Sequence, residues 1–129
     1  MVTKVELYDA FGELIYAVAK ADGVIQASEI SALNEIIDNH PWSSEIKWSF
    51  NYESKKAKSV EEAYQNALAI CQDYGPSPEY PYLIEVLEKI AAASDGIDAD
   101  EKALIDNFQR DLLAKFRKDL LDNKLTFRD

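Results

Sequence analysis

Two short acidic turns carry the residues of this chain with the clearest potential for chemistry. The first contains Asp22-Gly23 and the second contains Asp95-Gly96, and in both an apolar residue and then acidic residues follow the glycine. Carboxylate oxygens are hard ligands that suit Ca²⁺, Mg²⁺ or Mn²⁺ better than Zn²⁺. The paired turns therefore motivate the hypothesis of a divalent-cation site.

The first turn does not fit the pattern of a calcium-binding EF-hand loop. That loop needs oxygen ligands at its positions 1, 3 and 5, glycine at position 6 and glutamate at position 12. With Gly23 at position 6, Asp22 and Glu29 match the pattern, but Val18 and Lys20 occupy positions 1 and 3. The second turn departs further, with alanines at both of those positions. Neither loop can gather the oxygens that the ion needs, so the sequence argues against an EF-hand.

Each turn is more simply interpreted as a joint between two helices. Glycine accepts the left-handed conformation that ends a helix, and an acidic residue after it favours the positive start of the next helix. This accounts for the acidic residues that follow each glycine. It does not account for Asp22 and Asp95, because an aspartate at the C-terminal end of a helix faces the negative end of the dipole. A nearby cation or hydrogen-bond donor would offset that cost.

Residues suited to catalysis are scarce. The single histidine, His40, stands at an expected helix end before Pro41, and the single cysteine, Cys71, lies in an apolar run that predicts a buried structural thiol. We find no Ser-His pattern, no Cys-His pattern and no phosphate-binding loop in the sequence. We therefore expect no enzyme, with a metal hydrolase that uses only carboxylates as a minor alternative.

Apolar residues recur at helical spacing through most of the chain. In residues 5–21, for example, Leu7, Phe11, Leu14 and Val18 step by three or four and form one stripe. Gly12 inside this helix indicates close packing against a neighbour. The same periodicity predicts further helices at about residues 27–39, 59–75, 81–94 and 98–121.

Local signals mark the starts and the buried faces of these helices. Ser59 and Glu62 have the spacing of a capping box, as do Asp98 and Glu101. Pro81 suits the first turn of the helix at 81–94. The expected inner face of the helix at 27–39 consists of Ile30, Leu33, Ile36 and Ile37.

The aromatic segment at residues 42–52 is harder to assign. Trp42, Ile46 and Phe50 step by four, as on a helix, whereas alternate residues from 46 to 52 are apolar or aromatic, as on a strand. We favour a short helix, because the chain offers no second strand for pairing. Residues 53–58 are expected to form a polar connector.

Length and charge set the broad class. A chain of 129 residues with 47% hydrophobic side chains suits one domain with a proper core. We expect an all-α bundle of six to seven helices, in which two helix–turn–helix hairpins are related by pseudo-symmetry. The domain would span residues 1–129, with a core at about 5–118 and a tail at 119–129.

The 24 acidic residues outnumber the 14 basic ones, which gives a net charge of −10. This charge repels nucleic-acid phosphates and anionic membrane surfaces, which leaves cations and basic protein surfaces open as partners, with solubility as the simpler role of the charge. One cysteine cannot form an internal disulfide, and we find neither a leader peptide nor a membrane-spanning apolar run. We therefore expect a cytoplasmic protein without membrane insertion, and we leave its oligomeric state open, a homodimer included.

The pattern Ala-x-Ala-Asp-Gly-x-Ile-x-x-x-Glu at residues 19–29, with a second Asp-Gly copy near the C-terminus, resembles the TerB-like family. That family is named after tellurite resistance proteins and includes the N-terminal region of a membrane-anchored DnaJ-type co-chaperone. The resemblance covers residues 5–118 approximately, and it implies an all-helical domain with a role in tellurite or stress response. It also implies a divalent-cation site, for Ca²⁺ or Mg²⁺, at Asp22, Glu29, Asp95 and Glu101.

Two functions from different classes follow. The first is a non-catalytic stress protein that binds a divalent cation weakly at the two turns. The second is a protein-interaction module without a metal, which would use the aromatic segment at residues 42–52, because aromatic side chains are favoured interface anchors.

Overall fold

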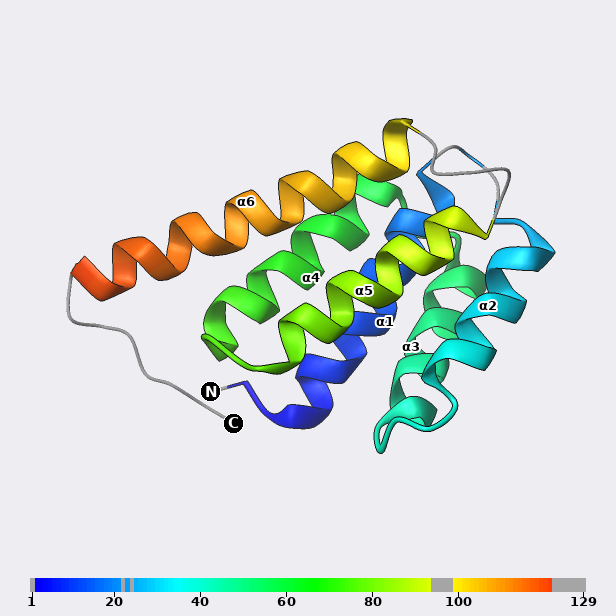
Figure 1. Cartoon of the computed structure of the whole chain (residues 1–129), viewed down its shortest axis with the longest axis horizontal. Helices are drawn as coiled ribbons and strands as arrows, with labels where there is room; N and C mark the ends of the chain where they lie inside the picture. The colour runs from blue at the N-terminus through cyan, green and yellow to red at the C-terminus, as the bar shows by residue number, and fades with distance from the viewer. Residues whose placement is uncertain (1, 22, 24, 94–98, 122–129) are drawn as a thin grey trace.

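The computed structural model describes residues 2–21, 23, 25–93 and 99–121 of the chain, and in these ranges all regular secondary structure is helical (Figure 1). This confirms the prediction of an all-α bundle. The six helices of the described ranges are α1 (Lys4–Lys20), α2 (Ala27–Ile37), α3 (Ser43–Lys56), α4 (Val60–Tyr74), α5 (Glu79–Ala92) and α6 (Ala99–Leu121).

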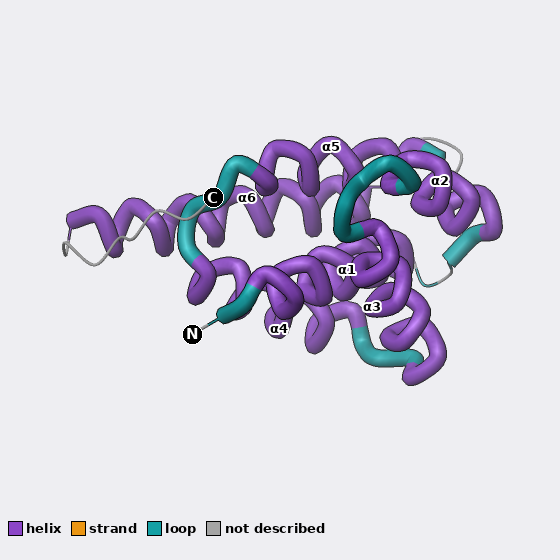
Figure 2. Tube along the Cα trace, turned by 90° about the horizontal axis from the view of Figure 1, so that it is seen from below, coloured by secondary structure: helices purple, strands orange, loops and turns teal. Residues whose placement is uncertain are grey.

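The helices form two layers. Figure 2 shows α1, α3 and α4 in one layer and α2, α5 and α6 in the other. Helix α1 packs against α3 and α4 within its own layer and against α5 and α6 across the interface between the layers. Figure 1 shows that the C-terminal part of α6 runs on past the ends of α4 and α5. One side of this part of α6 therefore has no helix of the bundle against it in either view.

Helix α1 forms the centre of the core. Every residue from Leu14 to Ala19 is at most 1% exposed, as expected for a helix with neighbours around its whole circumference. The prediction of close packing at Gly12 is also confirmed, because the backbone of α3 passes directly over this residue. The helix begins with a capping box in which Thr3 and Glu6 each accept a hydrogen bond from the backbone of the other.

Several predicted end signals are present. Gly23 has a φ of 103°, the left-handed region expected after α1. Ser59 accepts a hydrogen bond from the backbone N–H of Glu62 at 3.1 Å at the start of α4, which is the first half of the predicted capping box. Pro81 lies in the first turn of α5. The predicted N-cap Asp98 lies outside the described residues.

The aromatic segment is helical, as predicted, but α3 is longer than expected. It continues through residues 53–56, which we had assigned to a polar connector, and ends where Ala57 adopts a left-handed conformation with φ of 52°. The reason is tertiary: Glu53 is buried and forms an ion pair with Lys58, so a sequence that is polar throughout still has an inner face.

Helix α2 buries a narrower face than expected. It packs chiefly on α5, with Leu33 and Ile37 buried and Ile36 partly buried. Ile30 is 41% exposed, so its assignment to the inner face was wrong. A helix of 11 residues that meets mainly one neighbour buries a single stripe, and Ile30 lies outside that stripe.

Candidate functional site

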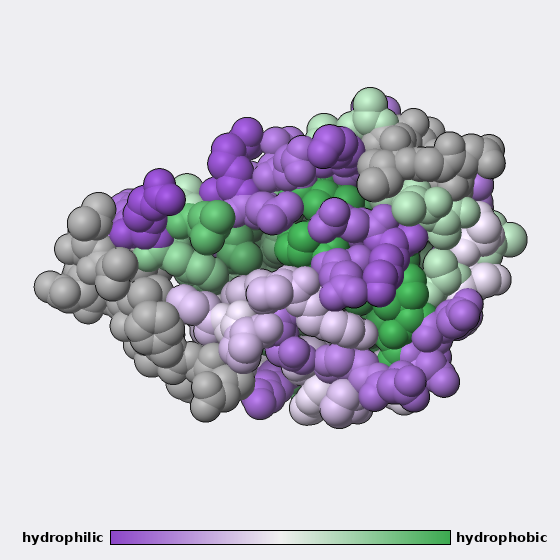
Figure 3. Space-filling model, viewed as in Figure 1, coloured by the Kyte–Doolittle hydropathy of each residue, from purple (hydrophilic) through white to green (hydrophobic). Residues whose placement is uncertain are grey.

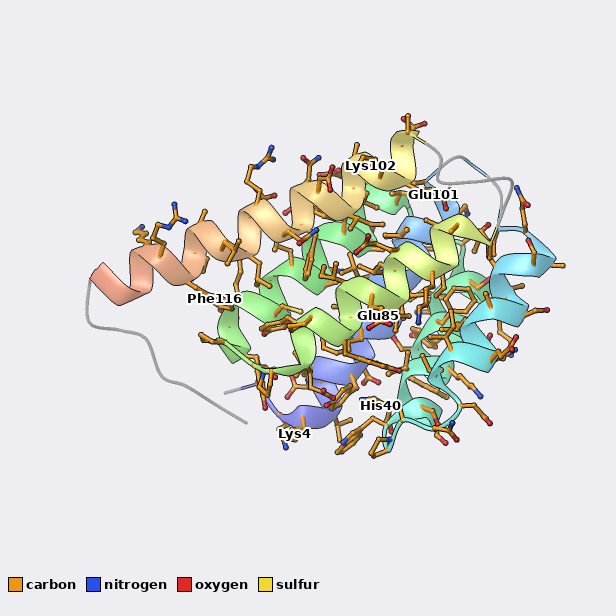
Figure 4. All side chains as sticks on the ribbon, viewed as in Figure 1. Lys4, His40, Glu85, Glu101, Lys102 and Phe116 are labelled. Atoms are coloured by element: carbon orange, nitrogen blue, oxygen red, sulfur yellow. The ribbon has the colours of Figure 1, made fainter. Side chains whose placement is uncertain are left out.

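The four acidic residues implied by the TerB-like resemblance are only partly within the described structure. Asp22 and Asp95 lie outside it. Glu29, in the first turn of α2, is 1% exposed and accepts a hydrogen bond from the backbone N–H of Gln26 at 3.0 Å. Glu101, in the first turn of α6, is fully buried (Figure 4). The two glutamates thus hold matching positions, near the positive ends of their helices.

A metal centre at the turns stays a prediction. Within residues 2–21, 23, 25–93 and 99–121, no three His, Cys, Asp or Glu side chains are arranged to hold a metal ion. Glu29 also has a structural role, since it completes the capping box of α2. The predicted cation site therefore depends on the two aspartates that lie outside the described residues.

The single histidine belongs to a hydrogen-bonded cluster that joins α1, α5 and the turn between α2 and α3. His40 Nδ1 accepts a hydrogen bond from the backbone N–H of Trp42 at 3.0 Å, so in the neutral ring Nε2 carries the proton and donates to Glu79 Oε1 at 2.7 Å. Tyr8 donates to the same carboxylate oxygen at 2.6 Å. Partial burial acts to raise the pKa of Glu79, but the hydrogen bonds from Tyr8 and His40 outweigh it and hold that pKa below its usual value. Because both ring nitrogens are engaged, the cluster fastens the α2–α3 turn to α5 and is poorly suited to proton transfer.

The aromatic segment divides into a packed part and an exposed part. The ring of Trp42 is partly buried and stacks on Tyr8 with 5.0 Å between centroids. Trp48 and Tyr52 stack on each other at 5.2 Å, yet they are 57% and 40% exposed. The second pair is therefore the part of the segment most open to a partner.

A buried ion triad lies beside this exposed pair. The ammonium of Lys58 is 2.7 Å from Glu13 Oε2 and 3.1 Å from Glu53 Oε2, and both glutamate side chains are less than 10% exposed. The backbone carbonyl of Lys58 accepts a hydrogen bond from the hydroxyl of Tyr16 at 2.5 Å. Glu13, Glu53 and Lys58 line a pocket of about 360 Å³ between α1, α3 and α4. Since the lysine of the chain itself compensates both carboxylates, the triad is a structural feature that joins α1, α3 and the connection between α3 and α4.

Asp9 lines the same pocket and faces other carboxylates. Burial, a hydrogen bond with the carboxyl of Glu45 and the charges of Glu6 and Glu13 raise the pKa of Asp9 to about 7. The ordinary value is 3.8. Because folded Asp9 binds its proton more tightly than the unfolded chain does, its contribution to stability is lost as the pH rises from about 4 to 7.

We therefore expect Asp9→Asn to be more stable than the wild type at pH 8, by about 1 kcal/mol once solvent screening is allowed for. The advantage should vanish below about pH 4, where Asp9 is protonated in both states. Thermal unfolding followed by circular dichroism between pH 4 and 8 would check this. The exposed Asp73→Asn is the control, and equal pH slopes in Asp9→Asn and the wild type would contradict the expectation.

A concave apolar surface lies between α5 and α6. It is a groove of about 810 Å³ in which both helices contribute apolar side chains. Figure 3 shows this apolar surface in the hollow between the two helices, with polar residues on both sides, and Figure 4 shows Phe116 at the end where α6 leaves the bundle. The apolar and aromatic lining residues include Tyr80, Ile84, Phe108, Leu112, Leu113 and Phe116.

The floor of the groove is rigid and its rim is exposed. The hydroxyl of Tyr80 donates to the backbone carbonyls of Cys71 at 2.9 Å and Gly75 at 2.7 Å, which fixes its ring. That ring lies 5.9 Å from the ring of Phe116. Leu113 is 59% exposed, the most exposed of the large hydrophobic side chains in the described ranges. A preformed apolar floor beside an exposed leucine is typical of a surface that receives another apolar group.

Sequence reasoning missed this groove. Leu104, Phe108, Leu112 and Phe116 step by four along α6 and form one apolar stripe, and Leu113 beside it widens the apolar face. That widening was the available signal. The periodicity of α6 alone could not show that its last turns have no helix across from them.

No protein-family model, curated protein or solved structure matches this chain. The resemblance to the TerB-like family therefore stays a prediction from the residues of the two turns. Among the described helices, none is both long and apolar enough to cross a lipid bilayer. The case for a function consequently depends on the geometry of the groove, the acidic turns and the exposed aromatic pair.

Proposed function

We propose that this chain is a non-catalytic binding module that takes an amphipathic segment of a partner protein into the α5–α6 groove. The observation that carries the proposal is the groove itself, with its apolar floor and the exposed Leu113 at its rim. An amphipathic helix laid into an apolar groove is a recurrent mode of peptide recognition. This proposal keeps the interaction class predicted from the sequence but moves the binding surface from residues 42–52 to α5 and α6.

The shape of the groove favours a segment over a compact small molecule. Its α5 side runs from Tyr80 to Ala92, a length of about 18 Å along the helix axis. Pockets for small molecules combine an apolar lining with a few converging polar groups. Here the charged side chains that line the groove, Glu85, Glu88 and Lys89, all come from α5. Such an arrangement fits a long apolar stripe with charges along one edge.

The charge of the rim favours a basic flank on the partner. Lys89 is engaged by Glu85 at 2.8 Å, so the pair is close to neutral and Glu88 adds an excess negative charge. The whole chain carries a net charge of −10, which attracts a basic segment over longer distances. We therefore infer a partner segment that presents apolar anchors to the groove and Lys or Arg to α5.

The described nucleophiles and bases support a binding role rather than catalysis. Cys71 is fully buried, and burial raises the pKa of its thiol, so the reactive thiolate is disfavoured. His40 uses both ring nitrogens within the hydrogen-bonded cluster that it forms with Glu79 and Trp42.

A helical model peptide of leucine and lysine tests the proposal by fluorescence anisotropy. We expect Leu113→Glu to weaken binding of this peptide by about tenfold, because a charged side chain at the rim opposes burial of the leucines. The added negative charge would by itself strengthen attraction to the lysines, so a loss of affinity reports on the groove rather than on general charge. Leu113 is exposed, so the variant should keep the fold.

The matched control is Ile30→Glu, which places the same charge at an exposed aliphatic position on α2, outside the groove. It should bind the peptide as the wild type does. A second peptide, with serine in place of leucine, should bind at least about tenfold more weakly to the wild type. Equal effects of the two glutamate substitutions, or equal binding of both peptides, would contradict docking in the groove.

A second candidate function is supported by the two buried glutamates. Glu29 and Glu101 hold matching positions in the first turns of α2 and α6, each about six or seven residues after an Asp-Gly turn aspartate. In this proposal Asp22 and Asp95 would join them in weak binding of Ca²⁺ or Mg²⁺, as the TerB-like resemblance implies, and the chain would serve a tellurite or stress response.

Calorimetric titration with Ca²⁺ and Mg²⁺ checks this second candidate. We expect heat of binding for the wild type and a loss of at least about tenfold in affinity for Asp22→Asn and Asp95→Asn, because an amide is a weaker ligand than a carboxylate for a hard cation. Asp73→Asn, an exposed aspartate of α4, serves as the control. Indistinguishable weak heats in all four proteins would exclude a cation site at the turns.

A further inference from the structure

We propose that residues 122–129 of the chain itself dock into the α5–α6 groove and compete with the partner for it. This inference rests on the proposed function, because it takes the groove to be a docking surface. These residues lie outside the described part of the structure, so the inference is drawn from the end of α6, from the dimensions of the groove and from the amino-acid sequence.

The first argument is reach. Helix α6 ends at Leu121, five residues or about 7.5 Å beyond Phe116, which lines the groove. An extended chain covers about 3.3 Å per residue. If residues 122 and 123 make the reversal of direction, residue 125 can come level with Phe116 and residue 127 with Leu112, which is about 6 Å beyond Phe116 along α6.

The second argument is the pattern of side chains. Leu125 and Phe127 are two residues apart, so both point to the same side of an extended segment. Asn123 stands just after the helix, where asparagine tolerates the left-handed conformation that reverses a chain. The segment therefore offers two apolar anchors to a groove with an apolar floor.

The third argument is charge. Lys124 and Arg128 flank the two apolar residues, and the groove is lined by Glu85 and Glu88 on α5. The segment has the chemistry inferred above for the partner, which is apolar anchors with basic flanks. A short tether also keeps it at an effective concentration in the millimolar range, so modest affinity suffices for occupancy.

A second copy of the chain is a weaker choice of occupant. Each copy carries a net charge of −10, and the resulting repulsion opposes association. The tethered segment meets no such penalty, since its own two acidic and two basic residues balance.

Paramagnetic relaxation in the chain of residues 1–129 tests the inference. A nitroxide label on Thr126→Cys should broaden the methyl signals of Ile84 and Leu113 in the groove and spare the methyl signals of Ile30 on α2. Cys71 is fully buried and should not take the label. Adding Phe127→Ser to the labelled chain should restore the groove signals. Sharp groove signals in the labelled chain, or broadening that Phe127→Ser does not relieve, would overturn the inference.

Two further measurements separate the explanations. The first is a mixture of two chains, one with the nitroxide and no isotope and the other with the isotope and no nitroxide. The signals of the isotope-labelled chain should show no broadening. Broadening in this mixture would identify a second copy as the occupant and overturn the inference.

The second measurement uses the variant Leu125→Ser/Phe127→Ser in the same chain of residues 1–129. It should bind the leucine–lysine peptide about tenfold more tightly, the factor expected if the groove is open about a tenth of the time. Unchanged affinity would overturn the competition while leaving the groove as a docking surface. Absence of peptide binding to both chains would instead refute the proposed function.

Discussion

Replacing Gly12 with alanine is expected to lower the free energy of unfolding by about 3 kcal/mol, the upper end of the range for overpacked cores. A Cβ at this position would clash with the backbone carbonyl oxygen of Ile46 and lie 2.7 Å from the Cβ of Ser49 and 3.0 Å from the backbone nitrogen of Phe50. These atoms belong to α3, two of them to its backbone, so they can give way only if the whole helix shifts. Because α1 is the centre of the core, a shift of α3 loosens packing beyond the contact itself.

Whether Gly12→Ala raises or lowers the free energy of unfolding shows how closely α1 and α3 pack. Alanine is a better helix former than glycine by about 1 kcal/mol, so an α1 without close packing would be stabilised by the change. Urea unfolding at pH 7 measures the difference, and a gain in stability would show that α1 and α3 are further apart than described. Gly23→Ala is the matched control, since its Cβ would meet no atom within 4 Å and only the positive φ opposes it. We expect it to cost about 1 kcal/mol.

Replacing Lys58 with alanine is the second large effect, expected to cost about 3 kcal/mol at pH 7. Removal of one partner from a buried ion pair leaves an uncompensated charge, and here it leaves two, on Glu13 and Glu53. We choose the lower end of the usual range because the lysine side chain is 20% exposed and water can partly replace it.

The loss of stability in Lys58→Ala should be smaller at low pH. In the wild type, burial raises the pKa of Glu13, while the hydrogen bond from Lys58 lowers it. Without the ammonium the folded-state pKa rises further above the unfolded value, so the variant loses stability as the pH increases from about 4 upward. At about pH 4 the carboxyl of Glu13 is largely protonated in both states and the cost of the substitution should be smallest.

Denaturant unfolding between pH 4 and 8 measures both the stability lost in Lys58→Ala at pH 7 and its dependence on pH. Lys58→Ala/Glu53→Gln should recover part of the loss, because it leaves only one carboxylate without its partner. The exposed Lys55→Ala, next to the C-terminus of α3, should leave the midpoint close to the wild type. A pH-independent deficit would mean that Lys58 acts through packing of its aliphatic stem rather than through charge.

Periodicity and end signals were reliable wherever the interaction is local. The stripe along α1, the left-handed Gly23 and the hydrogen bond from Glu62 to Ser59 all depend on residues within one or two turns of each other. They could therefore be predicted from residues that are close together in the sequence. The sequence predicted that Gly12 packs closely against another helix, but it could not show that this helix is α3.

Predictions failed where a distant residue decides the outcome. Residues 53–56 looked like a connector, yet Glu53 is buried because Lys58 meets it after the turn. Ile30 fits an apolar stripe, yet it is exposed because α2 packs chiefly on α5. Trp42 and Trp48 lie in the same aromatic segment, and only packing against Tyr8 separates the partly buried ring from the exposed one.

The sequence by itself determined the class of the fold and the positions of the two acidic joints, because helix periodicity and capping are properties of short stretches of chain. It also determined the acidic net charge. Only the tertiary structure decided where the apolar groove lies. In the described part of the chain α6 extends past α4 and α5, and Leu113 and Phe116 line an apolar groove with no helix over it; that depends on how the described helices pack rather than on any one of them.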